Sequence, residues 1–125
     1  MIVGTGIDIV AVARIARFRQ RHRARGLRRL FTDDELADCL RRAAPDPSLA
    51  ARFAAKEAFF KALGTGWGPG GDWTHVEVVR GRGGRPELRL HGRAALAARE
   101  RGVRRVHLSL AHTDSLAVAQ VVLEG

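Results

Sequence analysis

The sequence has few of the residues that define several protein classes. Cysteine occurs once, at Cys39, which excludes an internal disulfide and a cysteine-based zinc site. Tyrosine is absent, and aromatic residues make up only 6% of the chain. No apolar run reaches the ~20 residues that a membrane-spanning helix needs. The N-terminus also lacks the basic segment of a secretory signal peptide. These absences predict a cytoplasmic protein.

Acidic residues are scarce relative to basic ones. The chain has 22 lysines and arginines against 13 acids, which gives a formal net charge of +9. Only Lys56 and Lys61 are lysines, and the stretch from Ile9 to Thr32 holds eight arginines and no acid. A positive field of this kind attracts polyanions: nucleic acid, anionic lipid or an acidic protein. Composition alone does not choose among them.

Length and pattern predict one α+β domain covering residues 1–125, with helices packed on an antiparallel sheet. No linker, repeat or low-complexity segment divides the chain. The expected strands are Met1–Ala11, His75–Arg80, Glu87–His91, Arg104–Ala111 and Leu116–Leu123. The expected helices are Val12–Arg23, Asp33–Arg42, Leu49–Leu63 and Arg93–Arg101.

Local signals predict where the helices begin and end. Gly26 is expected to stop the first helix. Thr32 and Glu35 have the spacing of a capping box. Ser48 is a candidate N-cap for the third helix, and Gly64 is expected to end it. The glycine-rich stretch that begins at Gly64 is then a loop.

The helix Leu49–Leu63 places Glu57 and Lys61 one turn apart. Both border an apolar stripe formed by Leu49, Phe53, Phe59, Phe60 and Leu63. One interpretation is a solvated i,i+4 ion pair, which contributes a few tenths of a kcal/mol. The other is a functional site at the edge of the stripe.

Asp8 interrupts an apolar strand between Ile7 and Ile9. A carboxylate in a core-forming strand is costly unless it is paired or bound to a cation. Asp8 is either an acid that caps the following helix or one half of a site completed by Glu57. Two carboxylates with room for water suit magnesium bound together with substrate phosphates.

Two further segments are less specific. The loop Gly64–Gly71 can approach a phosphate closely, but it lacks P-loop spacing and is equally compatible with a flexible connector. His107 and Ser109 share the polar face of a strand, with His112 at the turn after it. Ser109 lacks the nucleophile elbow of a serine hydrolase.

Three segments together resemble the holo-acyl-carrier-protein synthase family of small bacterial 4'-phosphopantetheinyl transferases. The first is Gly6-Ile-Asp8, followed by Arg14. The second, and the most specific, runs from Arg52 through Lys56-Glu57 and Lys61 to Gly64-Thr-Gly66. The third combines Gly84-Arg85-Pro86 with Ser109 and His112. Their order and spacing match the family over nearly the whole chain.

The resemblance implies transfer of the phosphopantetheine arm of coenzyme A to a serine of acyl carrier protein. It implies Asp8 and Glu57 as Mg²⁺ ligands and Lys61 at the coenzyme A phosphates. The same family pattern puts Arg52 and Lys56 nearby, with Gly64, Pro86, Ser109 and His112 lining the nucleotide. Arg14, Arg17 and Arg21 would bind the acidic carrier, and a homotrimer would form the sites between subunits.

The sequence departs from the family pattern at two places. Arg85 stands where the family usually has lysine, and Trp67 stands where a smaller apolar residue is common. The alternative function, a basic nucleic-acid-binding module, has the arginine content in its favour. The low aromatic content and the absence of a nucleic-acid motif weigh against it.

Overall fold

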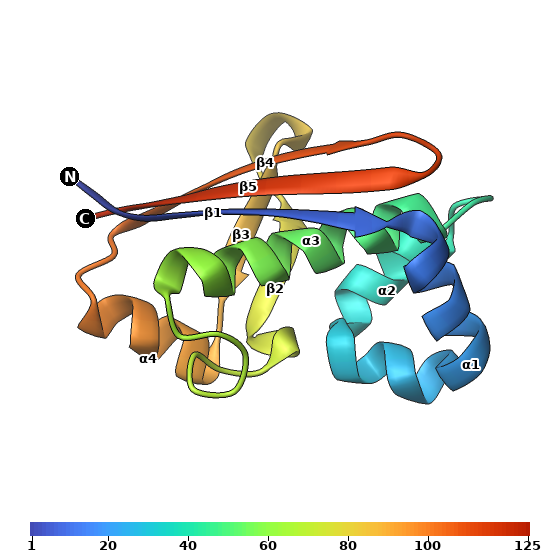
Figure 1. Cartoon of the computed structure of the whole chain (residues 1–125), viewed down its shortest axis with the longest axis horizontal. Helices are drawn as coiled ribbons and strands as arrows, with labels where there is room; N and C mark the ends of the chain where they lie inside the picture. The colour runs from blue at the N-terminus through green and yellow to red at the C-terminus, as the bar shows by residue number, and fades with distance from the viewer.

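The computed structural model describes all 125 residues and forms a small α+β fold around one long helix (Figure 1). The strands are β1 (Ile2–Ala11), β2 (Val76–Arg80), β3 (Pro86–Leu90), β4 (Arg105–His112) and β5 (Leu116–Glu124). The helices are α1 (Val12–Leu30), α2 (Asp33–Leu40), α3 (Asp46–Leu63) and α4 (Gly92–Glu100), with short 3-10 turns η1 (Trp73–His75) and η2 (Arg82–Gly84). The predicted fold class is confirmed.

Two antiparallel sheets flank α3. The larger has the strand order β1-β5-β4, so the first strand pairs with the last. Asp8 of β1 lies opposite Ala119 of β5, which in turn lies opposite Leu110 of β4. The smaller sheet is the β2–β3 hairpin. In Figure 1, α3 runs along the three-stranded sheet, α1 and α2 gather at one end, and α4 lies near the other.

Strand β1 packs directly on the backbone of α3. A side chain at Gly6 would overlap the Ala58 carbonyl oxygen, and one at Gly4 would overlap that of Ala62. Glycine therefore lets the strand approach the helix more closely than any other residue would permit. Asp8 lies on the same face of β1 as Gly4 and Gly6. The close approach of these glycines to α3 therefore sets the distance between Asp8 and the helix.

Helix α3 is the centre of the core, and all five residues of the predicted apolar stripe are buried. Alanines at 50, 51, 54, 55, 58 and 62 are buried as well. Burial extends beyond the stripe because small alanines let the sheet, α1 and the hairpin surround the helix. Gly64 ends α3 in the left-handed conformation, with φ of 81°, as predicted.

Two predicted helix signals are wrong: Gly26 as a stop and Ser48 as an N-cap. The first helix breaks at Arg23, where φ is 52°, at the predicted end, but a further helical segment continues through Gly26 to Leu30. Gly26 is buried, and a side chain there would overlap His22, so it serves close packing instead of termination. Helix α3 begins at Asp46, not after Ser48, because Pro47 fits the first turn. The capping box of Thr32 and Glu35 is confirmed.

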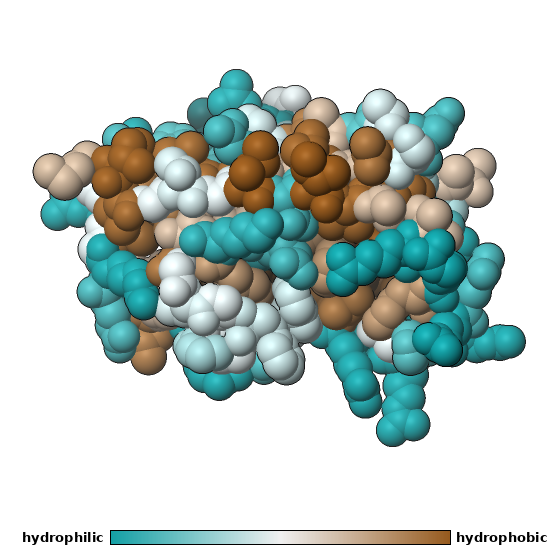
Figure 2. All heavy atoms as spheres, viewed as in Figure 1, coloured by the Kyte–Doolittle hydropathy of each residue, from teal (hydrophilic) through white to brown (hydrophobic).

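No helix has both the length and the apolar character to cross a membrane. Apolar side chains are exposed on the outer face of the larger sheet, including Ile7 at 58% and Ile9 at 64%. Figure 2 shows hydrophobic residues gathered along the upper part of the molecule, over β1 and β5. Long hydrophilic side chains project below, at the α1 end. The upper and lower sides of the molecule in this view therefore present different surface chemistry.

Candidate active site

Asp8 and Lys61 meet where β1 crosses the C-terminal half of α3. Lys61 Nζ donates to Asp8 Oδ1 at 2.8 Å and to the Ile7 carbonyl oxygen at 3.1 Å. The Asp8 side chain is largely buried, whereas that of Lys61 is 53% exposed. The hydrogen bond to Asp8 raises the pKa of Lys61. Lys61 therefore presents a stable positive charge at the surface beside a recessed carboxylate.

Glu57 lies one helical turn before Lys61, facing the same space. Burial raises the pKa of Glu57, and the neighbouring Asp8 charge raises it further, while Arg14 and Lys61 act in the opposite direction. No hydrogen bond or ion pair within the chain engages the Glu57 carboxylate. Two carboxylates thus repel each other across a partly buried gap, and a bound cation would relieve that repulsion.

The donor set of this gap fits magnesium. Nowhere in the structure do three or more His, Cys, Asp or Glu residues gather as a metal-binding group. Asp8 and Glu57 instead offer two carboxylates, beside space open to solvent. Mg²⁺ takes oxygen ligands, keeps several waters and commonly uses one or two carboxylates together with substrate phosphates. Asp8 and Glu57 therefore suit a cation whose remaining coordination positions are filled by water and by a phosphorylated substrate.

A pocket of about 480 Å³ adjoins the two charged residues of α3. Its lining residues are Glu57, Phe60, Lys61, Gly64, Gly66, Trp67 and Trp73. The indole rings of Trp67 and Trp73 stack at 5.9 Å between centroids, with an interplanar angle of 17°. Trp73 is not predicted as a site residue, because it lies after the glycine-rich loop and outside the family-like segments.

Helix α1 brings its arginines to the same side of the molecule. Arg14 lies over the Phe53 ring, 5.5 Å from the centroid, and its charge acts on Glu57. Arg14, Arg17 and Arg21 are exposed and line a groove of about 670 Å³ that also reaches Phe18 and Trp73. The three predicted partner-binding arginines therefore line one groove, and the charge of Arg14 reaches Glu57.

Lys56 is fully buried and lies away from the carboxylate gap. Its ammonium donates to Glu35 Oε1 at 2.7 Å, to the Val76 carbonyl at 2.6 Å and to the Trp73 carbonyl at 3.1 Å. Burial lowers the pKa of Lys56, and Glu35 opposes that shift. All three N–H donors are used inside the protein, so none remains for a phosphate. We therefore assign Lys56 to the core, which corrects the expectation that it lies at coenzyme A.

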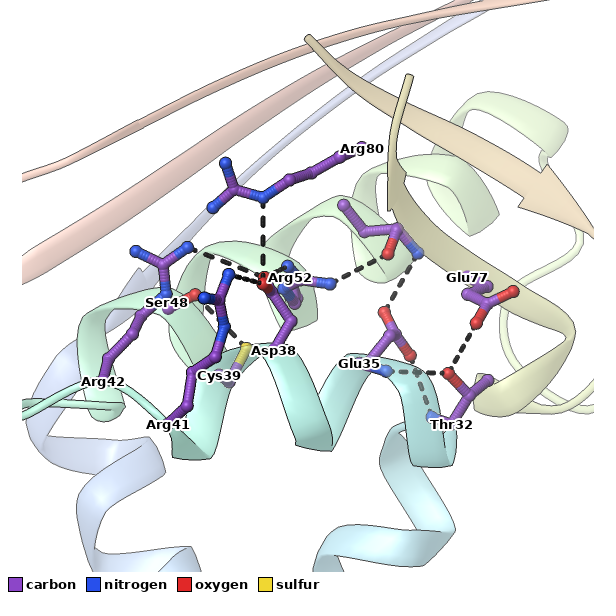
Figure 3. Close-up of polar contacts among 11 residues, drawn as sticks. Thr32, Glu35, Asp38, Cys39, Arg41, Arg42, Ser48, Arg52, Glu77 and Arg80 are labelled. Atoms are coloured by element: carbon purple, nitrogen blue, oxygen red, sulfur yellow. Dashed lines mark hydrogen bonds and ion pairs between the residues drawn. The ribbon is translucent and has the colours of Figure 1, made fainter. Parts of the chain in front are cut away.

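Arg52 belongs to a group of arginines around Asp38 (Figure 3). Its guanidinium contacts the Asp38 carboxylate and donates to the Val78 carbonyl at 2.8 Å. Arg41, Arg42 and Arg80 approach the same carboxylate, at 2.6, 3.6 and 3.8 Å. A hydrogen bond from Arg41 lowers the pKa of Asp38, and the charges of Arg52, Arg80 and Arg41 lower it further, against burial. Four arginines therefore surround a single carboxylate, so the cluster carries a net positive charge.

The remaining predicted residues lie on a different part of the surface. Pro86 and Ser109 line a pocket of about 820 Å³ between the edges of β3 and β4, together with Arg85 and Arg104. His112 ends β4 and is exposed. Strand β5 separates β4 from β1. Within one chain, Pro86, Ser109 and His112 are therefore not brought to Asp8 and Glu57.

Comparisons with known proteins identify the family of this chain. The family model described as the 4'-phosphopantetheinyl transferase superfamily matches residues 4–120. The holo-[acyl-carrier-protein] synthase of Koribacter versatilis is 52% identical over 99% of both chains, and that of Solibacter usitatus is 47% identical over 100% of both.

Solved structures give the same result. The holo-[acyl-carrier-protein] synthase of Neisseria meningitidis superposes with a TM-score of 0.91, at 34% identity, over 100% of both chains. The enzyme of Bacillus anthracis, solved in complex with CoA (3',5'-ADP), has a TM-score of 0.80 at 35% identity, over 98% of this chain and 96% of that one. The chain therefore belongs to the 4'-phosphopantetheinyl transferase superfamily.

Proposed function

We propose that this chain transfers the 4'-phosphopantetheine group of coenzyme A to a serine of apo acyl carrier protein. The serine oxygen forms a bond to the β-phosphorus of coenzyme A, and the bridging P–O bond breaks. Adenosine 3',5'-bisphosphate leaves, and the serine hydroxyl loses its proton. The observation that carries the proposal is the meeting of Asp8, Glu57 and Lys61 beside an open pocket.

Asp8 and Glu57 are the residues that would hold Mg²⁺. The bound cation would supply positive charge to the pyrophosphate as its bridging bond breaks. Their mutual repulsion and the lack of any partner for Glu57 support this assignment. The Glu57 carboxylate faces the space beside the phosphate, where it can receive the proton that the serine hydroxyl loses.

Lys61 and Gly64 bind the phosphates from the other side. Lys61 carries a charge that its contact with Asp8 stabilises, and its half-exposed ammonium has a third N–H free for a phosphate oxygen. Gly64 lies in the left-handed conformation with open space at its Cα, and it lines the same pocket. Both features suit close approach of an anion to the end of α3.

The chain acts as a homotrimer in this proposal, with each site completed by a neighbouring copy. Pro86, Ser109 and His112 lie away from the carboxylates of their own chain, so they contact a nucleotide held by Asp8 and Glu57 of another copy. The exposed apolar side chains of β1 and β5, visible in Figure 2, support a subunit interface on this sheet face.

In this proposal, Arg52 supports coenzyme A binding through its contact with Asp38. It is mostly buried, whereas Arg41 and Arg80 of the same cluster are exposed. The cluster in Figure 3 therefore offers guanidinium donors at the surface, held in place by one carboxylate. We assign this excess charge to a phosphate of coenzyme A bound between subunits, with Arg52 keeping the cluster together.

The α1 groove is the docking surface for the carrier. Acyl carrier proteins are acidic, and Arg14, Arg17 and Arg21 present positive charge along one helix. Arg14 also lies near enough to Glu57 to lower its pKa. A carrier bound along α1 therefore has its serine delivered toward the carboxylate gap.

The test is transfer observed on the carrier itself. The protein is incubated with coenzyme A, Mg²⁺ and apo acyl carrier protein, and the carrier is weighed by intact mass spectrometry. The parent chain is expected to add one phosphopantetheinyl group. Glu57→Gln and Asp8→Asn are each expected to lose at least about a hundredfold in rate, since each removes charge that stabilises the transition state.

A matched control separates loss of chemistry from loss of fold. Glu100→Gln removes an exposed carboxyl at the end of α4 and is expected to keep the parent rate. Circular dichroism and thermal unfolding should show all three variants folded. Carrier that gains no mass with the parent chain, or full activity in both Glu57→Gln and Asp8→Asn, contradicts the proposal.

A further inference from the structure

His75 joins the glycine-rich loop Gly64–Gly71 to the rest of the fold. Its Nδ1 atom lies 3.0 Å from the backbone nitrogen of Asp72, the residue that directly follows the loop. A backbone N–H can only donate, so Nδ1 is the acceptor, and the neutral ring carries its proton on Nε2. This hydrogen bond therefore exists only while Nδ1 carries no proton.

The His75 ring lies between the end of the loop and the start of α4. A β-carbon added at Gly71 would lie 3.1 Å from Nδ1, and one added at Gly92 would lie 2.8 Å from Nε2. The His75 carbonyl also accepts from the His91 backbone N–H at 2.8 Å. The side chain is only 23% exposed, so the loop end, η1 and α4 meet at this residue.

The loop has its own internal hydrogen bonds. Gly68 and Gly71 exchange two backbone hydrogen bonds of 3.1 Å. Where the loop leaves α3, the Gly64 N–H donates to the Phe60 carbonyl at 3.0 Å. Because the loop is closed in this way, its position relative to α3 depends on how its two ends are attached, and the second attachment is the contact between Asp72 and His75.

The position of the loop matters for the reaction. Gly64, Gly66 and Trp67 line the same pocket as Glu57 and Lys61. In the proposed function, on which this inference rests, phosphate oxygens bind at Gly64 and Lys61. A displaced loop would therefore weaken the binding of coenzyme A without any change in the two charged residues of α3.

Charged groups on the neighbouring elements act on the His75 ring. The Asp72 carboxylate lies 3.9 Å from Nε2 and favours the protonated ring. Arg93 of α4 donates to that carboxylate at 2.9 Å and opposes protonation. On β2, the Glu77 carboxylate is already hydrogen-bonded to His91 at 2.9 Å. Histidine ordinarily changes charge between about pH 5 and 8, so the contact with the loop is sensitive to pH in that range.

We propose that His75 is a positioning residue for the transferase reaction, and that its neutral ring holds the loop Gly64–Gly71 in place beside Glu57 and Lys61. Protonation of Nδ1 replaces the acceptor by an N–H that faces the Asp72 N–H, and the loop is released. Transfer in acid is then slower than titration of Glu57 alone would make it. The rival role for His75 is packing, which does not depend on the charge of the ring.

The variants His75→Asn and His75→Leu separate these two roles. The Oδ1 atom of asparagine takes the place of Nδ1 and accepts the Asp72 N–H at every pH, whereas leucine accepts nothing. At about pH 8, kcat/KM for coenzyme A should be within about twofold of the parent in His75→Asn and about fivefold lower in His75→Leu, as expected for one lost hydrogen bond. At about pH 5.5 the parent should be as slow as His75→Leu, and His75→Asn about fivefold faster than both.

The ratio of His75→Asn to the parent at each pH cancels the effects that both share, including titration of Glu57 and the pH dependence of Mg²⁺ binding. A ratio that stays constant between about pH 8 and 5.5 overturns the proposal. Equal losses in His75→Asn and His75→Leu also overturn it, because they indicate packing alone. His91→Gln, which keeps a donor to Glu77, should retain the pH dependence of the parent.

Intrinsic fluorescence gives a readout that does not need activity. The only tryptophans are Trp67 in the loop and Trp73 in η1, and their rings stack at 5.9 Å. Emission of the parent should change between about pH 8 and 5.5 as the loop is released, and that of His75→Asn should stay constant. His22 lines a pocket with both rings, so His22→Gln is the control and should keep the change. No change in the parent, or a change that persists in His75→Asn, overturns the proposal.

The outcomes separate this inference from the proposed function. A parent chain that modifies no carrier contradicts the proposed function, and the fluorescence titration then still decides whether His75 holds the loop. A parent chain that transfers normally, with the same pH dependence in His75→Asn, contradicts this inference alone. Circular dichroism checks the fold of each variant, and if His75→Leu is unfolded, the comparison of His75→Asn with the parent decides.

Discussion

Lys61 Nζ lies 2.8 Å from Asp8 Oδ1, although 53 positions separate the two residues in the chain. The same ammonium contacts the Ile7 carbonyl, so it joins α3 to β1 at the point where the strand crosses the helix. The Lys61 side chain is half exposed, so the contribution of this ion pair to stability is small. In the proposed function its importance is chemical, because it holds a positive charge beside the carboxylates of Asp8 and Glu57.

Replacing Lys61 by glutamine should therefore affect the reaction and spare the fold. We expect kcat/KM for coenzyme A to fall about a hundredfold, because a charge that stabilises the transferring phosphate is lost. The free energy of unfolding, measured by urea denaturation, should change by less than about 1 kcal/mol. Arg99→Gln, which removes a positive charge from exposed α4, serves as the control. Activity within twofold of the parent in Lys61→Gln would contradict the assignment.

For the buried Lys56–Glu35 pair we expect a substitution to lower the stability of the fold, in contrast to Lys61. Lys56→Met leaves the Glu35 carboxylate without its cation and should destabilise the protein by about 3–4 kcal/mol, measured by urea denaturation. Adding Glu35→Gln to Lys56→Met should restore part of that loss, because no charge is then buried alone. Strictly additive losses in the double variant would show that the two residues do not act as a pair.

Asp38 should stabilise the fold at neutral pH and lose this effect in acid. Its folded pKa is lowered by the hydrogen bond from Arg41 and by the arginines around it. A lowered folded pKa stabilises the native state above the unfolded pKa of about 3.9, and the contribution disappears as pH falls through the folded value. Asp38→Asn should lose about 2 kcal/mol at pH 7, and the difference from the parent should shrink below about pH 4. A constant difference from pH 7 to pH 2 would refute this.

Carrier binding should depend on the α1 arginines and on salt. The double variant Arg17→Ser/Arg21→Ser should raise KM for the carrier about tenfold and leave KM for coenzyme A unchanged, because these side chains line only the α1 groove. The KM for the carrier should depend less steeply on salt concentration in this double variant than in the parent chain. Arg99→Ser/Arg101→Ser, which removes equal charge from the α4 end, is the matched control. If duplex DNA competes with the carrier but no transfer occurs, the nucleic-acid alternative gains support.

Local sequence signals predicted the elements well. Thr32 and Glu35 cap α2, and Gly64 ends α3, because each signal depends on a few neighbouring residues. The predictions that Gly26 stops the first helix and that Ser48 is an N-cap were wrong. The conformation at Gly26 follows from its packing against His22, and Ser48 instead lies within α3, close to Cys39 Sγ. At both positions, packing or the helix start set by Pro47 outweighed the single-residue signal.

The site was predicted in part. An acid in an apolar strand demands a partner or a cation; the structure places the charge of Asp8 near Glu57 and pairs Asp8 with Lys61, and a shared cation between the two acids stays a prediction. Lys56 was misassigned, because its neighbour Glu57 faces the site while its own side chain meets Glu35 across the core. Sequence spacing indicates which residues share a helix, but the tertiary partners decide which of them reach solvent.

The glycines of β1 have one more consequence. Gly6 carries no reactive group, yet it sets how far the strand stands from α3, and Asp8 moves with that strand. A single added methyl group would widen the distance between the two acids without altering either of them. A random-mutagenesis screen for lost function should therefore recover Gly4 and Gly6 as readily as the residues that perform the chemistry.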